Sequence, residues 1–215
     1  MSKQCVLISI RPQWCELICN GKKTIEVRKS RPRMDTPFKC YIYCTHDKEH
    51  TLFKDWIDPP FVTKEYNIMN GKGIKNVFHD NRPWGNANGK VIGEFVCDHI
   101  TNLFTNSRFW LDEKAVEQAC LTGEQIREYA NGKDAYGWHI SALQIYDKPK
   151  ELSEFYRDCT EKDNCHKCIH WDSSYDNTYY EPPDPPFEGC RTGEKKHFIR
   201  PPQSWCYVEE YDGKR

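Results

Sequence analysis

The residues that can form a hydrophobic core are distributed unevenly along this 215-residue chain. Residues 1–150 carry regularly spaced aliphatic and aromatic side chains, whereas residues 151–200 are rich in Asp, Tyr and Lys and include the stretch EPPDPP at 181–186. A segment with so little aliphatic surface cannot offset the entropy that is lost when it becomes ordered. The sequence therefore predicts a packed domain over 1–150, an extension over 151–200 that needs another source of stability, and a final strand and tail over 201–215.

Strand and helix signals alternate through the first 150 residues and predict an α+β fold. A strand at 5–10 precedes Pro12, which suits the first turn of a helix, and Gly21 can close that helix in the left-handed conformation. A capping box at 122–125 opens a second helix. Gly93 predicts a bulge or tight bend inside a strand. The further expected strands lie at 24–28, 40–45, 90–100, 136–146 and 200–208.

The long segment 46–89 is charged, aromatic and rich in Gly and Asn, which predicts an inserted loop region with weak local structure. The formal net charge of the chain is -1, so any contact with a polyanion requires a local group of cations. We see neither a secretory signal nor an apolar run of the roughly 20 residues that a membrane span needs. We therefore expect a cytoplasmic protein without a membrane partner.

Three charged residues follow the first helix closely. Lys23 lies at the junction between helix and strand, and Glu26 and Arg28 alternate with apolar residues on the strand. Residues two apart on a strand share a face, so Glu26 and Arg28 are expected about 6.5–7 Å apart along it. The two cations can contact phosphate or base edges, and the carboxylate can orient a cation or accept from an exocyclic amine. A solvated strand face with an ordinary ion pair is the alternative.

The segment from Gly21 to Arg28, GKKTIEVR, resembles the G-x-K-x-x-E-x-R signature of ASCH domains, a branch of the PUA-like superfamily. The surrounding sequence SIRPQWCELICNGKKTIEVRKSRP, the strand that contains Gly93, and YGWHI at 136–140 are also similar to that family. The resemblance covers about residues 4–150, with 46–89 as a variable insertion. It implies a small PUA-like β-barrel with helices at its rim. It also implies that RNA or another nucleic acid binds across the cleft that carries the motif.

The residues around the motif extend this predicted nucleic-acid interface. The local cluster of cations comprises Arg11, Lys22, Lys23, Arg28, Lys29, Arg31 and Arg33. Trp138, on a later strand, is a candidate for stacking a base, and a place in the core is its alternative. The interface predicted to bind RNA or a modified nucleotide consists of Arg11, Lys22, Lys23, Glu26, Arg28 and Trp138.

Two hydrolytic activities occur in the same superfamily and stay open as alternatives. Some small ASCH-type proteins are amidohydrolases that act on acylated cytidine through a Lys, a Thr and a Glu. Lys23 matches the Lys, but Glu26 stands where that pattern has the Thr nucleophile, so only Thr24 could supply the hydroxyl. Other members of the family are ribonucleases, for which Lys23, Glu26 and Arg28 could supply a base and cationic stabilisation.

Twelve cysteines fall into two populations. Those in apolar strands, Cys5, Cys40, Cys44 and Cys97, are expected to be buried as small hydrophobes. Those in the polar extension, Cys159, Cys165, Cys168 and Cys190, have the spacing C-x5-C-x2-C-x21-C, which favours a tetrahedral structural Zn²⁺. His166, His170 or Cys206 could replace one of these ligands. An adaptor that binds proteins through this zinc-stapled segment is the third functional alternative.

Overall fold

The computed structural model describes residues 4–50, 52, 87–105, 110–156 and 200–211, together with short strands at 66–67, 73–76, 157–158 and 195–197. The four cysteines of the predicted zinc site, His166 and His170 lie outside these residues, as does most of the 46–89 insertion. In chain order the elements are β1 Gln4–Ile10, α1 Pro12–Cys19, β2 Ile25–Arg28, β3 Phe38–Cys44, β4 Tyr66–Asn67, β5 Gly73–Asn76, β6 Lys90–Asn102, β7 Phe104–Thr105, β8 Trp110–Leu111, α2 Glu113–Gln118, α3 Gly123–Ala130, β9 Tyr136–Glu151, the 3₁₀ turn η1 Leu152–Glu154, β10 Tyr156–Asp158, β11 Lys195–His197 and β12 Trp205–Glu209.

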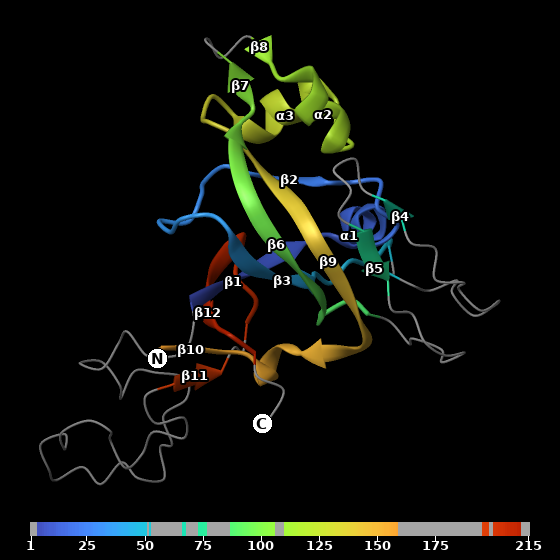
Figure 1. The fold of residues 1–215 in the computed structure, drawn as a ribbon, viewed down its shortest axis with the longest axis vertical. Helices are drawn as coiled ribbons and strands as arrows, with labels where there is room; N and C mark the ends of the chain where they lie inside the picture. Colours follow the sequence, from blue (N-terminus) through green and yellow to red (C-terminus); the bar gives the residue numbers. More distant parts are fainter. Residues whose placement is uncertain are drawn as a thin grey trace, which may run out of the picture.

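One curved sheet organises the molecule, with the strand order β12-β1-β3-β6-β9-β5-β4 and β2 paired to β9 (Figure 1). The long strands β6 and β9 pair antiparallel along most of their length, with three register shifts. The predicted bend at Gly93 lies at one of these shifts. Its cause is steric, because a Cβ at Gly93 would lie 2.4 Å from the carbonyl oxygen of Gln144.

The predicted helix after the first strand is α1, and its ends follow from local signals. Pro12 occupies the first turn, and the N–H groups of Asn20 and Gly21 donate to carbonyls of the last helical turn. Gly21 has a φ of 76°, a left-handed conformation that favours glycine. The chain therefore reverses within a few residues, and Lys23 lies between the end of α1 and the start of β2.

Helices α2 and α3 cover the end of the long strands where β2 pairs with β9 (Figure 1). The predicted capping box is present, because the Thr122 hydroxyl accepts from the Gln125 N–H and the Gln125 side chain accepts from the Thr122 N–H. Ile25 and Val27 of β2 pack against α2 and α3 in one apolar cluster, in which Ile126 is fully buried. The alternation predicted for β2 is thus confirmed, with these two side chains in a core.

The main core fills the inner side of the sheet and contains cysteines among aliphatic and aromatic residues. All four cysteines that were expected to be buried have at most 1% exposure. A second cluster joins β1 and β3 to residues beyond 150, since Leu152, Phe155 and Val208 pack against Leu7 and Tyr41. The last strand, β12, pairs antiparallel with β1 as expected. The chain beyond residue 150 therefore contributes to the same sheet and core as the residues before it.

The architecture is a mostly-strand half-barrel sheet with few helices, an α+β arrangement. Among the described residues, no hydrogen-bonded ladder joins β12 to β2, so the pairings given for this part of the chain do not close the predicted barrel. Within the insertion, β4 and β5 form a short hairpin, and β5 pairs parallel with β9. The insertion thus has more regular structure than its sequence predicted. None of the described helices is both long and apolar enough to cross a membrane.

Candidate nucleic-acid interface

The three charged residues of the motif lie inside the molecule. Lys23, Glu26 and Arg28 have exposures of only 2%, 4% and 8%. They do not form the solvated strand face that was the alternative interpretation of their spacing, because α1, α3 and residues 203–204 surround them at the floor of a cavity. Three charges that are held together in an interior site cost free energy to desolvate, and direct pairing is what offsets this cost.

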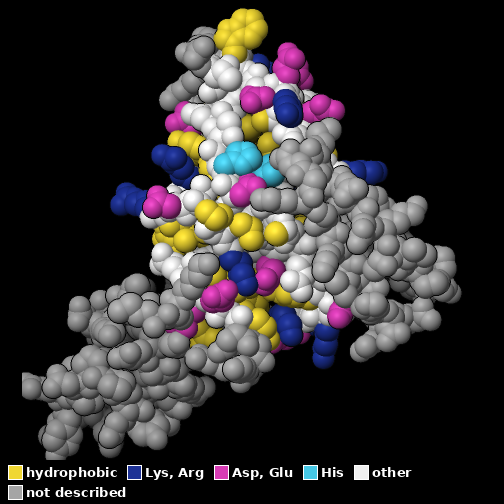
Figure 2. Space-filling view, viewed as in Figure 1, with side chains coloured by type: hydrophobic (Ala, Val, Ile, Leu, Met, Phe, Trp, Pro, Cys, Tyr) yellow, Lys and Arg dark blue, Asp and Glu magenta, His cyan; other side chains and the backbone are white. Residues whose placement is uncertain are grey.

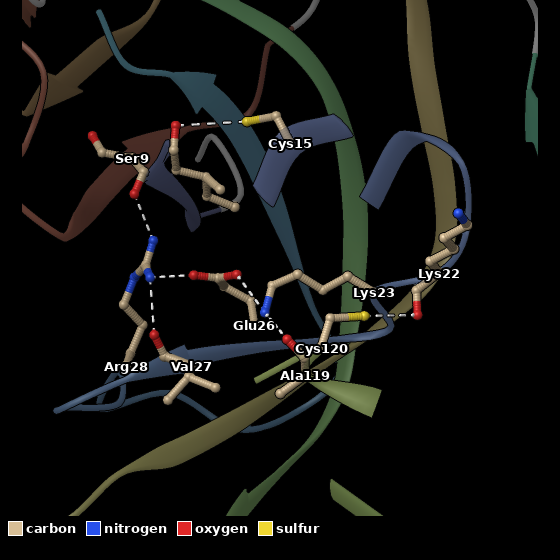
Figure 3. Close-up of polar contacts among 10 residues, drawn as sticks. Ser9, Cys15, Lys22, Lys23, Glu26, Val27, Arg28, Ala119 and Cys120 are labelled. Atoms are coloured by element: carbon tan, nitrogen blue, oxygen red, sulfur yellow. Dashed lines mark hydrogen bonds and ion pairs between the residues drawn. The ribbon is translucent and has the colours of Figure 1, made fainter. Parts of the chain in front are cut away.

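Glu26 lies between the two cations and contacts both of them (Figure 3). Its Oε1 accepts from Nη1 of Arg28 in a buried ion pair. Its Oε2 lies 3.5 Å from Nζ of Lys23. The carboxylate thus compensates both cations, and the direct contact brings Glu26 and Arg28 closer than strand spacing alone predicts.

Arg28 also connects β2 to the opposite side of the half-barrel. Its Nη2 donates to the carbonyl oxygen of Ser9 in β1, and its Nη1 donates to that of Val27 at 2.9 Å. Ser9 is in turn bound to the segment before β12, since its hydroxyl donates to the Pro202 carbonyl at 2.6 Å and its N–H to the Ser204 carbonyl at 2.9 Å. Arg28 therefore helps to hold three distant segments of the chain around the cavity.

Lys23 is fixed by two further contacts. Its ammonium group donates to the carbonyl oxygen of Ala119, at the end of α2, over 2.6 Å. It also lies over the ring of Trp14, 5.3 Å from the ring centroid. The carbonyl, the carboxylate and the aromatic face all favour the charged amine, so Lys23 is a preorganised cation at the cavity floor.

The cavity above these residues has a volume of about 530 Å³, within the usual range for small-ligand sites. Trp14 and Tyr129 supply aromatic surface, and Arg11 adds a third cation. The full lining is Ser9, Arg11, Gln13, Trp14, Lys23, Glu26, Val27, Arg28, Thr45, Leu121, Gln125, Tyr129, Gln203 and Ser204. Three cations against one carboxylate give the lining a positive balance, although the whole chain is nearly neutral.

Two polar atoms of the motif have no hydrogen-bond partner within the protein. Oε2 of Glu26 and Nε of Arg28 are both buried and unpaired by hydrogen bonds. One is an acceptor and the other a donor, and both residues line the cavity. Buried polar groups of this kind are rare, and each such group requires an explanation, of which a ligand or ordered water is one.

The structure brings together only part of the predicted interface. Arg11 lines the cavity with the motif residues, but Lys22 is exposed and does not. Figure 3 shows the Lys22 side chain directed away from Lys23 and Glu26. Because successive residues at this turn face opposite ways, only one of the two adjacent lysines reaches the interior. The inclusion of Lys22 in the site is therefore wrong for this cavity.

Trp138 is also not an interface residue. It is fully buried in the main core, where Phe38 contacts it edge-on and Trp205 lies 5.7 Å away between ring centroids. No face of its ring is available to a base, so the core alternative is the one that the structure shows. Thr24 does not line the cavity either, so the structure does not complete the hydrolytic set of Lys23, Thr24 and Glu26.

Several lining residues were missed from the sequence. Gln13, Gln125, Tyr129, Gln203 and Ser204 come from three separate segments, and nothing in their local patterns marks them as partners. Tyr129 gave the only available signal, as an aromatic on the polar side of an amphipathic helix. Trp14 was interpreted as part of the apolar stripe of α1, and it both packs against the main core and lines the cavity.

No protein-family model and no curated protein matches this chain. The chain is similar to the crystal structure of ASCH from Zymomonas mobilis, with 18% identity and a TM-score of 0.46 over 95% of this chain and 87% of that chain. It is also similar to two single-substitution variants of that protein, with 17% identity and a TM-score of 0.47 over 97% and 91% of the two chains, and with 16% and 0.44 over 97% and 93%. The solved structures to which this chain is similar thus carry the name of the family that the Gly21–Arg28 motif resembles.

Proposed function

We propose that this protein binds RNA, or a modified nucleotide, by taking one base into the cavity whose floor is formed by Lys23, Glu26 and Arg28. The observation that carries the proposal is the buried, paired set of charges at the bottom of a site that remains large enough for a ligand. Holding these charges away from water costs stability, so a role in ligand recognition explains why they lie there.

The polar edge of a base matches the unpaired atoms of the floor. Oε2 of Glu26 can accept from an exocyclic amine or a ring N–H, and Nε of Arg28 can donate to a carbonyl or ring nitrogen. A base edge that presents a donor beside an acceptor would satisfy both atoms. Such a site discriminates strongly against ligands that lack one of the two groups, because a buried polar atom then stays unpaired.

Aromatic side chains in the lining supply a surface for the face of the base. Trp14 is half-buried beside the floor, and Tyr129 is 39% exposed and lines the cavity from α3. Lys29 lies over the ring of Tyr129, 4.9 Å from its centroid, so a cation accompanies this aromatic. Stacking on such a ring contributes about 1–3 kcal/mol per base and tolerates any base identity.

Exposed cations beside the cavity provide for the phosphates. Arg11 lines the cavity, and Lys29, Arg31 and Arg33 follow β2 at the protein surface. The net charge of -1 means that these few local contacts supply the electrostatic part of the affinity. We therefore expect a shallow salt dependence, with a slope that corresponds to only a few neutralised phosphates.

The test measures the binding of a fluorescein-labelled single-stranded RNA octamer of mixed sequence by fluorescence anisotropy. Tyr129→Ala removes an exposed aromatic without disturbing the buried charges, and its affinity is expected to fall roughly 5- to 150-fold, equivalent to 1–3 kcal/mol. Glu26→Gln should weaken binding further by removing the acceptor. Lys22→Met is the matched control, because it changes an exposed cation next to the motif but outside the cavity.

A panel of free nucleosides, including acylated and methylated ones, then separates RNA from a modified nucleotide as the ligand, with the shift in Tm as the readout. Circular dichroism confirms that each variant is folded. If Tyr129→Ala and Glu26→Gln bind RNA and nucleosides as well as Lys22→Met does, the cavity is not the binding site and the proposal is wrong.

For the extension, we propose that Cys159, Cys165, Cys168 and Cys190 hold one structural Zn²⁺, with His166, His170 or Cys206 as possible replacements for one ligand. Their spacing and the low aliphatic content of 151–200 support this proposal. Four protein ligands would leave no position for a catalytic water. Elemental analysis of the purified protein should give at least one zinc per chain, and less than about half an equivalent would contradict the proposal.

A further inference from the structure

A bulge in β6 brings two side chains against a single residue of β9. Cys97 pairs with Ile140 and Ile100 pairs with Trp138, so Asp98 and His99 together lie opposite His139. In a regular strand, adjacent side chains point to opposite faces, and an extra residue is what allows both to meet one partner. His139 follows the buried Trp138 directly in β9, which places it on the other face of the sheet, away from the core.

The three side chains converge on one point. Oδ1 of Asp98 lies 2.6 Å from Nδ1 of His139 and 2.9 Å from Nδ1 of His99. The two imidazole rings stack, with centroids 4.4 Å apart and planes inclined by 24°, so both turn the same nitrogen to the same carboxylate oxygen. One ligand atom from each residue lies within 4.8 Å of the others. Figure 2 shows histidine and acidic side chains touching at the middle of this face.

We infer that Asp98, His99 and His139 form a binding site for a divalent transition-metal ion of the Zn²⁺ class, separate from both the cavity and the cysteine-rich extension. Two imidazoles and one carboxylate are a donor set that suits zinc. Around a tetrahedral zinc, neighbouring ligand atoms lie about 3.3 Å apart, as follows from metal–ligand distances near 2.0–2.1 Å. The observed contacts are shorter, so the carboxylate needs to retreat by only a fraction of an ångström for an ion to enter.

Metal binding replaces the two hydrogen bonds to Asp98. Each neutral ring gives up the proton on Nδ1, carries its proton on Nε2 instead, and coordinates through the Nδ1 lone pair. A ring that is protonated on both nitrogens must release one proton, so affinity falls as the solution becomes acidic. Three protein ligands leave the fourth tetrahedral position open to water or to a small anionic or nitrogen ligand.

Burial gives the site both rigidity and access. His139 is 6% exposed at its side chain and Asp98 28%, so these two ligands are held by the sheet. His99 is 55% exposed and covers His139, which leaves an entry path from solvent. A site of this kind is preorganised on its buried side and closed by one mobile ligand, an arrangement that lowers the entropy lost on metal binding.

The experiment follows the histidine side chains directly, so that cysteine ligation elsewhere does not interfere. The full chain, labelled with ¹⁵N in its histidines, is titrated with Zn²⁺ under reducing conditions, and long-range ¹H–¹⁵N spectra report which ring nitrogens change. His99→Ala and Asp98→Asn assign the signals, and His50→Ala is the control, since His50 is an exposed histidine outside the cluster. A parallel titration with Co²⁺ distinguishes the ligand sets, because only thiolate ligation gives strong charge-transfer absorption.

We expect Zn²⁺ to shift the Nδ1 signals of His99 and His139 together, and Co²⁺ to add a component without thiolate absorption. His99→Ala and Asp98→Asn should lower the affinity of this component at least tenfold, since even the loss of outer partners of metal ligands costs 10–100-fold. His50→Ala should leave it unchanged. If the Nδ1 signals of His99 and His139 stay in place when the metal is added, or if His99→Ala binds as well as His50→Ala, the cluster is only a hydrogen-bonded triad.

Discussion

Replacing Glu26 by Gln tests the electrostatics of the cavity floor most directly. The variant keeps the size of the side chain and a carbonyl oxygen for Arg28, but it leaves two buried cations without their shared carboxylate. At the 3.5 Å separation from Lys23 and an effective dielectric constant near 20, the lost attraction to that residue alone is about 5 kcal/mol before desolvation is subtracted. Removing one partner of a buried ion pair typically costs about 3–5 kcal/mol, and we expect a loss of free energy of unfolding in that range.

The assay is urea unfolding followed by tryptophan fluorescence, in which such a loss shifts the midpoint by roughly 1–2 M. Glu16→Gln is the matched control, because Glu16 is an exposed carboxylate on α1, and its change should stay within about 0.5 kcal/mol. The double variant Lys23→Met/Glu26→Gln should recover about 1–3 kcal/mol relative to additivity, since it also removes the unpaired ammonium group. If Glu26→Gln is as stable as Glu16→Gln, the carboxylate is solvated and the argument from buried charge is refuted.

Three further predictions concern the sheet and its buried groups. Gly93→Ala should cost roughly 1–3 kcal/mol, because its Cβ would meet a backbone carbonyl at 2.4 Å; thermal unfolding should show a smaller effect for Gly132→Ala, whose Cβ meets nothing within 4 Å, and equal effects would contradict the steric explanation. Burial, and then the charge of Glu94, raise the pKa of Tyr146, so its contribution to stability is complete below about pH 10 and is lost as the pH rises above that value. Tyr146→Phe should therefore flatten the decline of stability in alkali, measured by urea unfolding at several pH values, and an unchanged slope would count against this cause. Burial raises the pKa of Cys97 to about 12, so iodoacetamide at pH 8 should modify the partly exposed Cys120 well before Cys97, as peptide mass spectrometry would show; equal rates would be inconsistent with the structure.

Signals confined to a few neighbouring residues were sufficient to predict most elements of the fold. Pro12 and Gly21 set the ends of α1, and the box from Thr122 to Gln125 set the start of α3, because each acts through hydrogen bonds or backbone angles within one turn. The bend at Gly93 was also predicted, but its cause, a close carbonyl on β9, requires the pairing of two strands. Short-range physics thus determined where elements begin and bend, and not how they pair.

The candidate site shows the limit of the same reasoning. The motif identified Lys23, Glu26 and Arg28, and its spacing indicated a shared face, but their burial depends on residues far away in the chain. Lys23 donates to a carbonyl 96 positions later, and no local pattern carries that information. The error at Trp138 has the same origin, since alternation gives two faces of a strand and does not say which of them the core occupies.

The hydrogen bonds from Ser9 to residues 202 and 204 have a consequence for the order in which the cavity is made during synthesis. The floor residues emerge from the ribosome early, but Gln203 and Ser204, which complete one wall, are translated more than 170 positions later. A nascent chain that ends before this segment holds the charged floor beside an open flank, and it cannot enclose a base. The protein therefore acquires its binding capacity only once β12 has docked beside β1, which separates the folding of the sheet from the onset of function in time.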